Sequence, residues 1–403
     1  MLVYFSILAV AILFGGFNMI FFLIILEFIL ILNSKLAPHN QFNDDFLSLN
    51  NTKRIQGFFA LLIIAHHFSQ VIIFGKDSAG YFDVFCNIGY LFVCVFFFFS
   101  GYGLIKSYYT KKDYLKNFLR NRLPVVIIPL YLVNTILTVI VLFTGKNFYK
   151  DKNPLSYGMN TLFYKITSFS GITLMNSSSW YMVAISLFYL CFFFAFKRNR
   201  KNDNVGILIM GIFIAIYITI CMFAGIGPYW FQGDWWYNSC LLLLIGMIFA
   251  KNEDKIIKFM KKFYILLFPI SLIGSIVIAK KSIFIVNNVT YYNPGLSGKI
   301  DSLYCLAFQT LSGIFFLTFI LTLTMKLSFK NKILDYLGAL SLEIYLVHRI
   351  FLLCLRSNYI YIENKAIYLG LVYLLSILSS ILLHKIDQGI LNIIRRKYNS
   401  RNS

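Results

Sequence analysis

Charged residues are scarce in this 403-residue chain, at 13% of the sequence, while hydrophobic residues make up 59%. Soluble domains usually carry about 25% charged residues, so charge this sparse excludes a large soluble protein and predicts a polytopic membrane protein. Acidic residues are scarcer still, 16 against 37 Lys and Arg, which gives a formal net charge of +21. The cations lie in short runs between apolar segments, which topology and anionic membrane lipid explain. We therefore expect lipid contact and no nucleic-acid partner.

Paired cysteines are also absent, because none of the seven cysteines forms a CxxC motif. Most lie within apolar runs, where free cysteine behaves as a small buried hydrophobe. We expect neither a disulfide framework nor a bound metal. The first residues, "MLVYFSILAVAILFGGF", lack a basic leading region and an A-x-A cleavage site. We interpret them as a retained membrane helix and not as a signal peptide.

Apolar segments long enough to cross a bilayer recur along the chain. A span needs about 20 mostly apolar residues. Eleven candidate segments are 3–32, 55–74, 83–105, 123–143, 179–196, 205–224, 235–250, 262–280, 302–325, 333–356 and 366–384. The expected fold is therefore all-α, a polytopic integral membrane protein with about eleven transmembrane helices. It would consist of an additional N-terminal helix over 1–34, a ten-span membrane domain over 35–390 and a basic tail over 391–403.

The predicted loops fall into two sets by charge. The basic set carries 26 Lys and Arg and the opposite set carries 10. The basic set comprises 33–54, 106–122, 197–204, 251–262, 326–332 and 385–403. Because Lys-rich and Arg-rich loops stay in the cytoplasm, this split predicts an N-terminus outside and a C-terminus in the cytoplasm. Low Gly and Pro with abundant Ile, Lys, Asn and Phe indicate an AT-rich bacterium, so we expect the protein in a bacterial cell membrane.

Two adjacent histidines, His66 and His67, end the apolar run "ALLIIAHHFSQ" at 60–70. Ionisable residues inside a membrane are rare and are functional candidates by default. His67 would lie about 18 Å along a helix that starts near residue 55, at or past the bilayer midplane. Gln56 is eleven residues earlier, on nearly the same face, whereas His66 points about 100° away. The alternative is a buried histidine that only bonds two helices together.

The tenth predicted span, with "LGALSLEIYLVHRIF" at 337–351, carries a polar stripe. Its helical spacing places Ser341, Tyr345 and His348 on one face, with Arg349 at its border and Glu343 pointing elsewhere. A single Ser or Tyr here would more often hold helices together. The full stripe, at a depth similar to that of His67, predicts the lining of a functional cavity.

The loop 106–122 holds six cations beside several aromatic residues. Plain positive-inside charge is one explanation. The other is a site for a phosphorylated cytoplasmic ligand, with Lys116, Arg120 and Arg122 on an interfacial helix.

Three further residues interrupt or begin predicted spans. Ser100 breaks an aromatic run in the third span, either for close helix packing or for substrate contact. Trp180 and Tyr181 open the fifth span, either as anchors at the membrane surface or as contacts for a sugar ring.

Five of these segments, in order, resemble motifs of the acyltransferase 3 family, whose members are multispanning membrane enzymes that O-acetylate polysaccharides and other acceptors. The segments are "QGFFALLIIAHH" (56–67), "FFFFSGY" (96–102), "RNRLPVVIIPLY" (120–131), "WYMVAISLFY" (180–189) and "SLEIYLVH" (341–348). Each motif is weak alone, but five in family order are a strong signal. Gln56 departs from the pattern, because the family has a basic residue there, and so do Val125 in place of an arginine and the additional first span.

The resemblance implies a stand-alone O-acetyltransferase without a fused extracytoplasmic domain. It would move an acyl group from cytoplasmic acyl-CoA, with acetyl-CoA as the consumed donor, to a hydroxyl of a surface polysaccharide such as a capsule or exopolysaccharide, or of its lipid-linked precursor. His67 would act as the base, with His66 as the alternative. The CoA phosphates would bind Arg54, Lys116, Arg120 and Arg122. The substrates would contact Ser100, Trp180, Tyr181, Ser341, Tyr345, His348 and Arg349.

Two other classes of function stay open at the level of sequence. A transporter or flippase for lipid-linked sugars would also contain many spans and buried ionisable residues. Transporters commonly show two related halves, and this sequence shows no such symmetry. The loss of basic character at Gln56 also allows a non-catalytic homologue of the acyltransferases.

Overall fold

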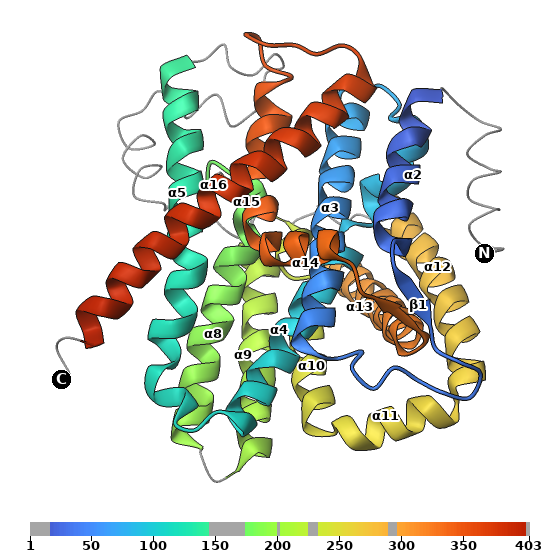
Figure 1. The fold of residues 1–403 in the computed structure, drawn as a ribbon, viewed down its shortest axis with the longest axis vertical. Coiled ribbons are helices and arrows are strands. Elements are labelled where there is room, and N and C mark those ends of the chain that lie inside the picture. Colours follow the sequence, from blue (N-terminus) through green and yellow to red (C-terminus); the bar gives the residue numbers. More distant parts are fainter. Residues whose placement is uncertain (1–16, 145–173, 200–201, 225–232, 289–295, 400–403) are drawn as a thin grey trace. The chain divides into compact units, whose positions relative to one another are not determined.

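The computed structural model describes residues 17–144, 174–199, 202–224, 233–288 and 296–399. Within these residues nearly all regular structure is helical, and one small sheet pairs two three-residue strands (Figure 1). The expectation of an all-α polytopic membrane protein is therefore confirmed.

Eight helices among the described residues are long and apolar enough to cross a membrane. They are α3 (Leu49–Phe74), α4 (Gly89–Thr110), α5 (Phe118–Thr144), α8 (Trp180–Arg198), α9 (Asp203–Ala224), α12 (Tyr264–Asn288), α13 (Leu296–Lys326) and α16 (Lys365–Asn399). Each coincides with one of the predicted segments.

Three predicted spans differ from the structure. The segment 333–356 is not one straight helix, because α14 (Lys332–Ala339) and α15 (Ser341–Cys354) meet at a bend of 74° and form a ninth span only if counted together. The segment 235–250 forms a short turn and then α10 (Leu241–Lys251), which at about 1.5 Å per residue is too short to cross. Of the segment 3–32, the structure describes α2 (Phe17–Ile31), and residues 1–16 lie outside the described part.

The remaining elements are short. They comprise the 3₁₀ turns η1 (Gly80–Asn87), η2 (Tyr114–Asn117), η4 (Ser177–Ser179) and η5 (Asp234–Trp236), the helix α11 (Glu253–Lys262), and the strands β1 (Ser34–Leu36) and β2 (Leu327–Phe329). The two strands pair antiparallel, with Lys35 opposite Ser328. Alternation over three residues is too brief for a sequence signal, so this sheet was not predicted.

The chain divides into two compact units. Unit 1 comprises Met1–Gly89, Val139–Met159 and Leu327–Lys385. Unit 2 comprises Tyr90–Thr138, Asn160–Lys326 and Ile386–Ser403.

In unit 1, α3 packs against α14, α15 and η1. The crossing of α3 and α14 has no side chain between the two backbones. A Cβ atom on Gly57 would lie 2.4 Å from the backbone nitrogen of Gly338, and a Cβ atom on Gly338 would lie 2.5 Å from the carbonyl oxygen of Lys53. Only glycine permits this approach, which is a common way for membrane helices to pack closely.

The helix α14 has one buried face and one exposed face, and the chain bends after it. Leu334, Leu337 and Gly338 are buried within unit 1, while Asp335 and Tyr336 are exposed. Leu340 leaves helical geometry, with φ −100° and ψ 4°, and the chain restarts as the more apolar α15.

In unit 2, aromatic side chains from α4, α8 and η5 build the core. The rings of Phe97 and Tyr181 have centroids 4.7 Å apart, and those of Trp180 and Trp236 are 6.2 Å apart. The helices α12 and α13 pack against each other. Lys106 at the end of α4 pairs with Glu253 at the start of α11, at 2.6 Å.

We predict that Gly57→Ala lowers the melting temperature of the detergent-solubilised protein by several degrees. The added methyl group would push α14 away from α3, and overpacking of this kind costs roughly 1–3 kcal/mol. Gly103→Ala is the matched control, because a Cβ atom there meets nothing within 4 Å and alanine favours a helix. Equal melting temperatures for Gly57→Ala and the wild type would contradict the close crossing.

Candidate active site

Three histidines of unit 1 lie together, two from α3 and one from α15. The rings of His67 and His348 are stacked, with centroids 5.1 Å apart and planes at 21°. The ring of His66 lies 4.7 Å from that of His67. Tyr345 adds a ring 6.1 Å from that of His348. The polar stripes that the sequence placed on two separate spans therefore meet at His67 and His348.

The 3₁₀ turn η1 orients the two histidines of α3. Two carbonyl groups near its end, those of Phe85 and Cys86, accept hydrogen bonds from side chains of α3. The Nδ1–H group of His66 donates to the carbonyl oxygen of Phe85, at 2.7 Å. The next carbonyl, that of Cys86, accepts from the side-chain amide of Gln70, at 3.4 Å, and the Oε1 atom of Gln70 accepts from Nδ1–H of His67, at 3.0 Å.

These contacts determine where the proton sits on each neutral ring. Since Nδ1 donates in both His66 and His67, Nε2 carries the lone pair. An imidazole in this tautomer can take a proton at Nε2 and is therefore able to act as a base.

The surroundings of the two Nε2 atoms differ. A Cβ atom on Gly89 would lie 2.3 Å from Nε2 of His66, so the Gly89 backbone closes that edge of the ring. His66 turns its reactive edge toward this wall, whereas His67 stacks on His348. The Gly89 backbone therefore restricts access to Nε2 of His66.

His348 is fully buried, and one of its ring nitrogens has no hydrogen-bond partner among the described residues. Its Nδ1–H group donates to the carbonyl oxygen of Ile344, at 3.2 Å. Its Nε2 atom is buried and has no hydrogen-bond partner among the described residues. A buried polar atom without a partner is costly, and a substrate that brings a donor group would remove this cost.

Other residues of the predicted stripe have local roles. Ser341 donates to the carbonyl oxygen of Gly338, at 3.2 Å, and so belongs to the bend before α15. Arg349 is half-buried directly after His348. Glu343 is buried, and its carboxylate pairs with Nδ1 of His384 on α16, at 2.6 Å. His384 was not among the predicted residues, although it also ends an apolar run, the signal that identified His67.

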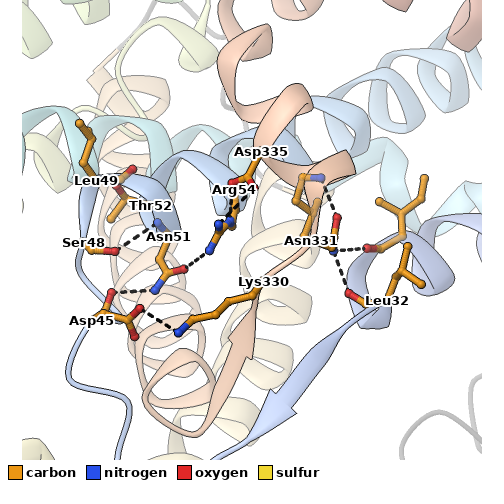
Figure 2. A network of polar contacts seen from close by, with 12 residues as sticks. Leu32, Asp45, Ser48, Leu49, Asn51, Thr52, Arg54, Lys330, Asn331 and Asp335 are labelled. Atoms are coloured by element: carbon orange, nitrogen blue, oxygen red, sulfur yellow. Dashed lines mark hydrogen bonds and ion pairs between the residues drawn. The ribbon is translucent and has the colours of Figure 1, made fainter.

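Arg54 is tied into a network at the start of α3 (Figure 2). Its guanidinium forms two bonds to Asp335, at 2.5 and 3.2 Å, and one to Asn51, at 2.8 Å. Asn331 caps α14 by accepting from the Leu334 amide, and it also donates to two carbonyls at the end of α2, those of Ile29 and Leu32. This network fixes the relative positions of α2, α3 and α14 within unit 1.

The remaining predicted site residues belong to unit 2. Ser100 and Tyr181 form a hydrogen bond of 3.2 Å between α4 and α8. Trp180 and Tyr181 are each only 6% exposed, so both are buried in the aromatic core. The hydrogen bond between the hydroxyl groups of Ser100 and Tyr181 joins α4 to α8. Ser100 therefore contributes to helix packing and also stays a candidate for substrate contact.

The three cations of the 106–122 region lie in different settings. Lys116 is exposed in η2, and Arg120 and Arg122 lie in the first turns of α5, so they do not share one interfacial helix. Arg122 donates to the hydroxyl groups of Tyr114, at 3.2 Å, and Ser107, at 3.5 Å. Of the three, Lys116 has the most accessible charge.

No set of three His, Cys, Asp or Glu side chains is placed to hold a metal ion in the part of the chain that the structure describes. The imidazoles of His66 and His67, with Nε2 unprotonated, are able to take part in acid–base chemistry.

A comparison with protein families gives one match. The family model of an acyltransferase domain, of the acyltransferase 3 type, matches residues 54–385. This range contains all three clustered histidines and ends one residue after His384. Neither the curated proteins nor the solved structures gave a match.

We predict that Arg54→Gln and Asp335→Asn each lower the free energy of unfolding by about 1 kcal/mol, and that the double variant loses little more than either single one. Asp335 is 46% exposed, which keeps the effect small. Thermal unfolding in detergent measures it, with Lys53→Gln as the exposed neighbouring control. Fully additive losses would show that the pair contributes nothing to stability.

Proposed function

The chain belongs to the acyltransferase 3 family and is thus a membrane acyltransferase, and on this premise we propose that it is an O-acetyltransferase. It moves an acetyl group from cytoplasmic acetyl-CoA to a hydroxyl of a cell-surface polysaccharide or of its lipid-linked precursor. The observation that best supports this proposal is the stacked pair of His67 and His348, with lone pairs on both Nε2 atoms.

In the proposed reaction, Nε2 of His67 removes the proton from the sugar hydroxyl. The oxygen attacks the thioester carbonyl carbon, so that a carbon–oxygen bond forms and the carbon–sulfur bond breaks. The proton then passes from His67 to the departing CoA thiolate, which leaves as a thiol. General base catalysis of this kind contributes about 10²- to 10⁴-fold. A transient acyl-imidazole on His67 is the alternative route.

His348 supplies a second acceptor beside the base. Its unpartnered Nε2 would accept a hydrogen bond from another hydroxyl of the acceptor. A sugar carries neighbouring hydroxyl groups, so it suits a pair of imidazoles better than an isolated alcohol does. Tyr345 and Arg349 would stabilise the oxyanion of the tetrahedral intermediate.

The donor side of the proposal depends on the cations. Lys116 is exposed and suits a phosphate group of CoA. Arg120 and Arg122 are further candidates in the same region. Arg54 would have to leave its bidentate pair with Asp335 to bind a phosphate, which makes it the weakest of the four.

We predict that His67→Ala lowers acetyl transfer by about 100-fold or more, since the base is lost. His66→Ala is expected to retain more activity, because its Nε2 edge is closed by Gly89. The measurement is acetate released by alkali from purified surface polysaccharide, at matched expression. Wild-type acetylation in His67→Ala cells would exclude His67 as the base.

We predict that Lys116→Gln raises the KM for acetyl-CoA several-fold and leaves kcat unchanged, because it removes a binding contact only. Membrane vesicles with radiolabelled acetyl-CoA measure this, and Lys111→Gln, an exposed lysine of the same loop, is the control. Equal KM values for both variants and the wild type would remove Lys116 from the site. If no label reaches any glycan, the proposed transfer from acetyl-CoA to a surface glycan is wrong.

A further inference from the structure

Gln70 lies three residues after His67 on the same face of α3, and it contacts both the base and η1. We propose that Gln70 is the positioning residue of the base: its carboxamide holds His67 as the Nδ1–H tautomer and directs Nε2 toward the acceptor hydroxyl. This inference rests on the proposed function, and the motif match that singled out His67 did not include Gln70.

The orientation of the carboxamide follows from its two contacts. The Cys86 carbonyl can only accept, so the amide nitrogen of Gln70 must face it, at 3.4 Å. Oε1 then faces Nδ1 of His67, at 3.0 Å, and can only accept. The reverse orientation would set two oxygens against each other and would leave the proton of His67 on Nε2. A ring with its proton on Nε2 cannot take a proton from substrate at that atom.

The Cys86 carbonyl, which accepts from Gln70, belongs to η1, and side-chain hydrogen bonds and an ion pair stabilise this turn. Asp83, in the first part of η1, accepts hydrogen bonds from the Ala79 amide, at 2.6 Å, and the Ser78 hydroxyl, at 2.7 Å. Just before the turn, Asp77 pairs with Lys365 at the start of α16, at 2.7 Å, and this hydrogen bond lowers the pKa of the Asp77 carboxyl. Gln70 is thus attached to a fixed point of unit 1.

A carboxamide in this position has a chemical consequence. In serine proteases a carboxylate holds the imidazole and stabilises the imidazolium that forms. A neutral carboxamide fixes the same tautomer with less stabilisation of that charge. The imidazolium of His67 would therefore readily return its proton, as the thiolate leaving group of CoA requires.

The test compares four variants of the full-length protein in membrane vesicles, with radiolabelled acetyl-CoA and the surface-glycan fraction of the producing cells as probes. Gln70→Leu removes the hydrogen bond and keeps the size. Gln70→Glu keeps an acceptor oxygen and adds charge. Tyr373→Phe is the control, because it removes one hydrogen bond to the α3 backbone, at the Leu61 carbonyl, away from the histidines. His67→Ala tests the base itself.

We expect Gln70→Leu to lower kcat by about 10- to 100-fold, as misorientation of a catalytic group does, with the KM for acetyl-CoA unchanged. We expect Gln70→Glu to retain more activity and to shift the acidic limb of its pH–rate profile to higher pH. The sign follows because the base must be neutral, and a neighbouring carboxylate favours its protonated form. Tyr373→Phe should keep both the rate and the pH profile of the wild type.

The outcomes separate the two proposals. If His67→Ala is inactive while Gln70→Leu stays within about twofold of the wild-type kcat, the role of Gln70 is wrong and the proposed function stands. If His67→Ala is fully active, the proposed function itself fails. Should Gln70→Leu not fold, an unshifted pH profile in Gln70→Glu overturns the inference, because a carboxylate bonded to the base must move it.

Discussion

The structure of unit 1 depends on the backbone contact between Gly57 on α3 and Gly338 on α14. His67 follows Gly57 by ten residues, and His348 follows Gly338 by ten residues. The crossing therefore sets where each helix continues, and the bend at Leu340 turns α15 so that His348 stacks on His67. Without the close approach of two glycines, side chains would separate the helices and the imidazole rings would not meet.

A second constraint is that polar groups inside an apolar helix need hydrogen-bond partners. The turn η1 provides them from two consecutive carbonyls, one for His66 directly and one for His67 through Gln70. Backbone carbonyls serve this purpose whatever the side chains of the turn are. The same hydrogen bonds give each imidazole a defined tautomer. They offset the cost of burying the polar rings, and they also leave Nε2 unprotonated and able to accept a proton.

Part of the candidate site could be predicted from the sequence. Spacing within one helix placed Tyr345 and His348 together, and the depth of His67 on its span matched that of His348. Spacing could not show that Arg54 is bound by Asp335, because the two residues are 281 positions apart. Nor could it show that Trp180 is buried by rings from other helices, since a tryptophan at the start of a span is equally typical of a membrane surface.

The sequence by itself determined the fold class, most of the membrane spans, the family and the histidines as candidate residues. These depend on composition, local apolar length and short motifs, which are properties of contiguous residues. Only the tertiary structure decided that α14 and α15 bend apart, that Gly89 closes one edge of His66, that Glu343 pairs with His384, and that Gln70 holds His67. Each of these depends on where distant backbones approach one another, and hydrophobic periodicity along a single helix carries no information on that.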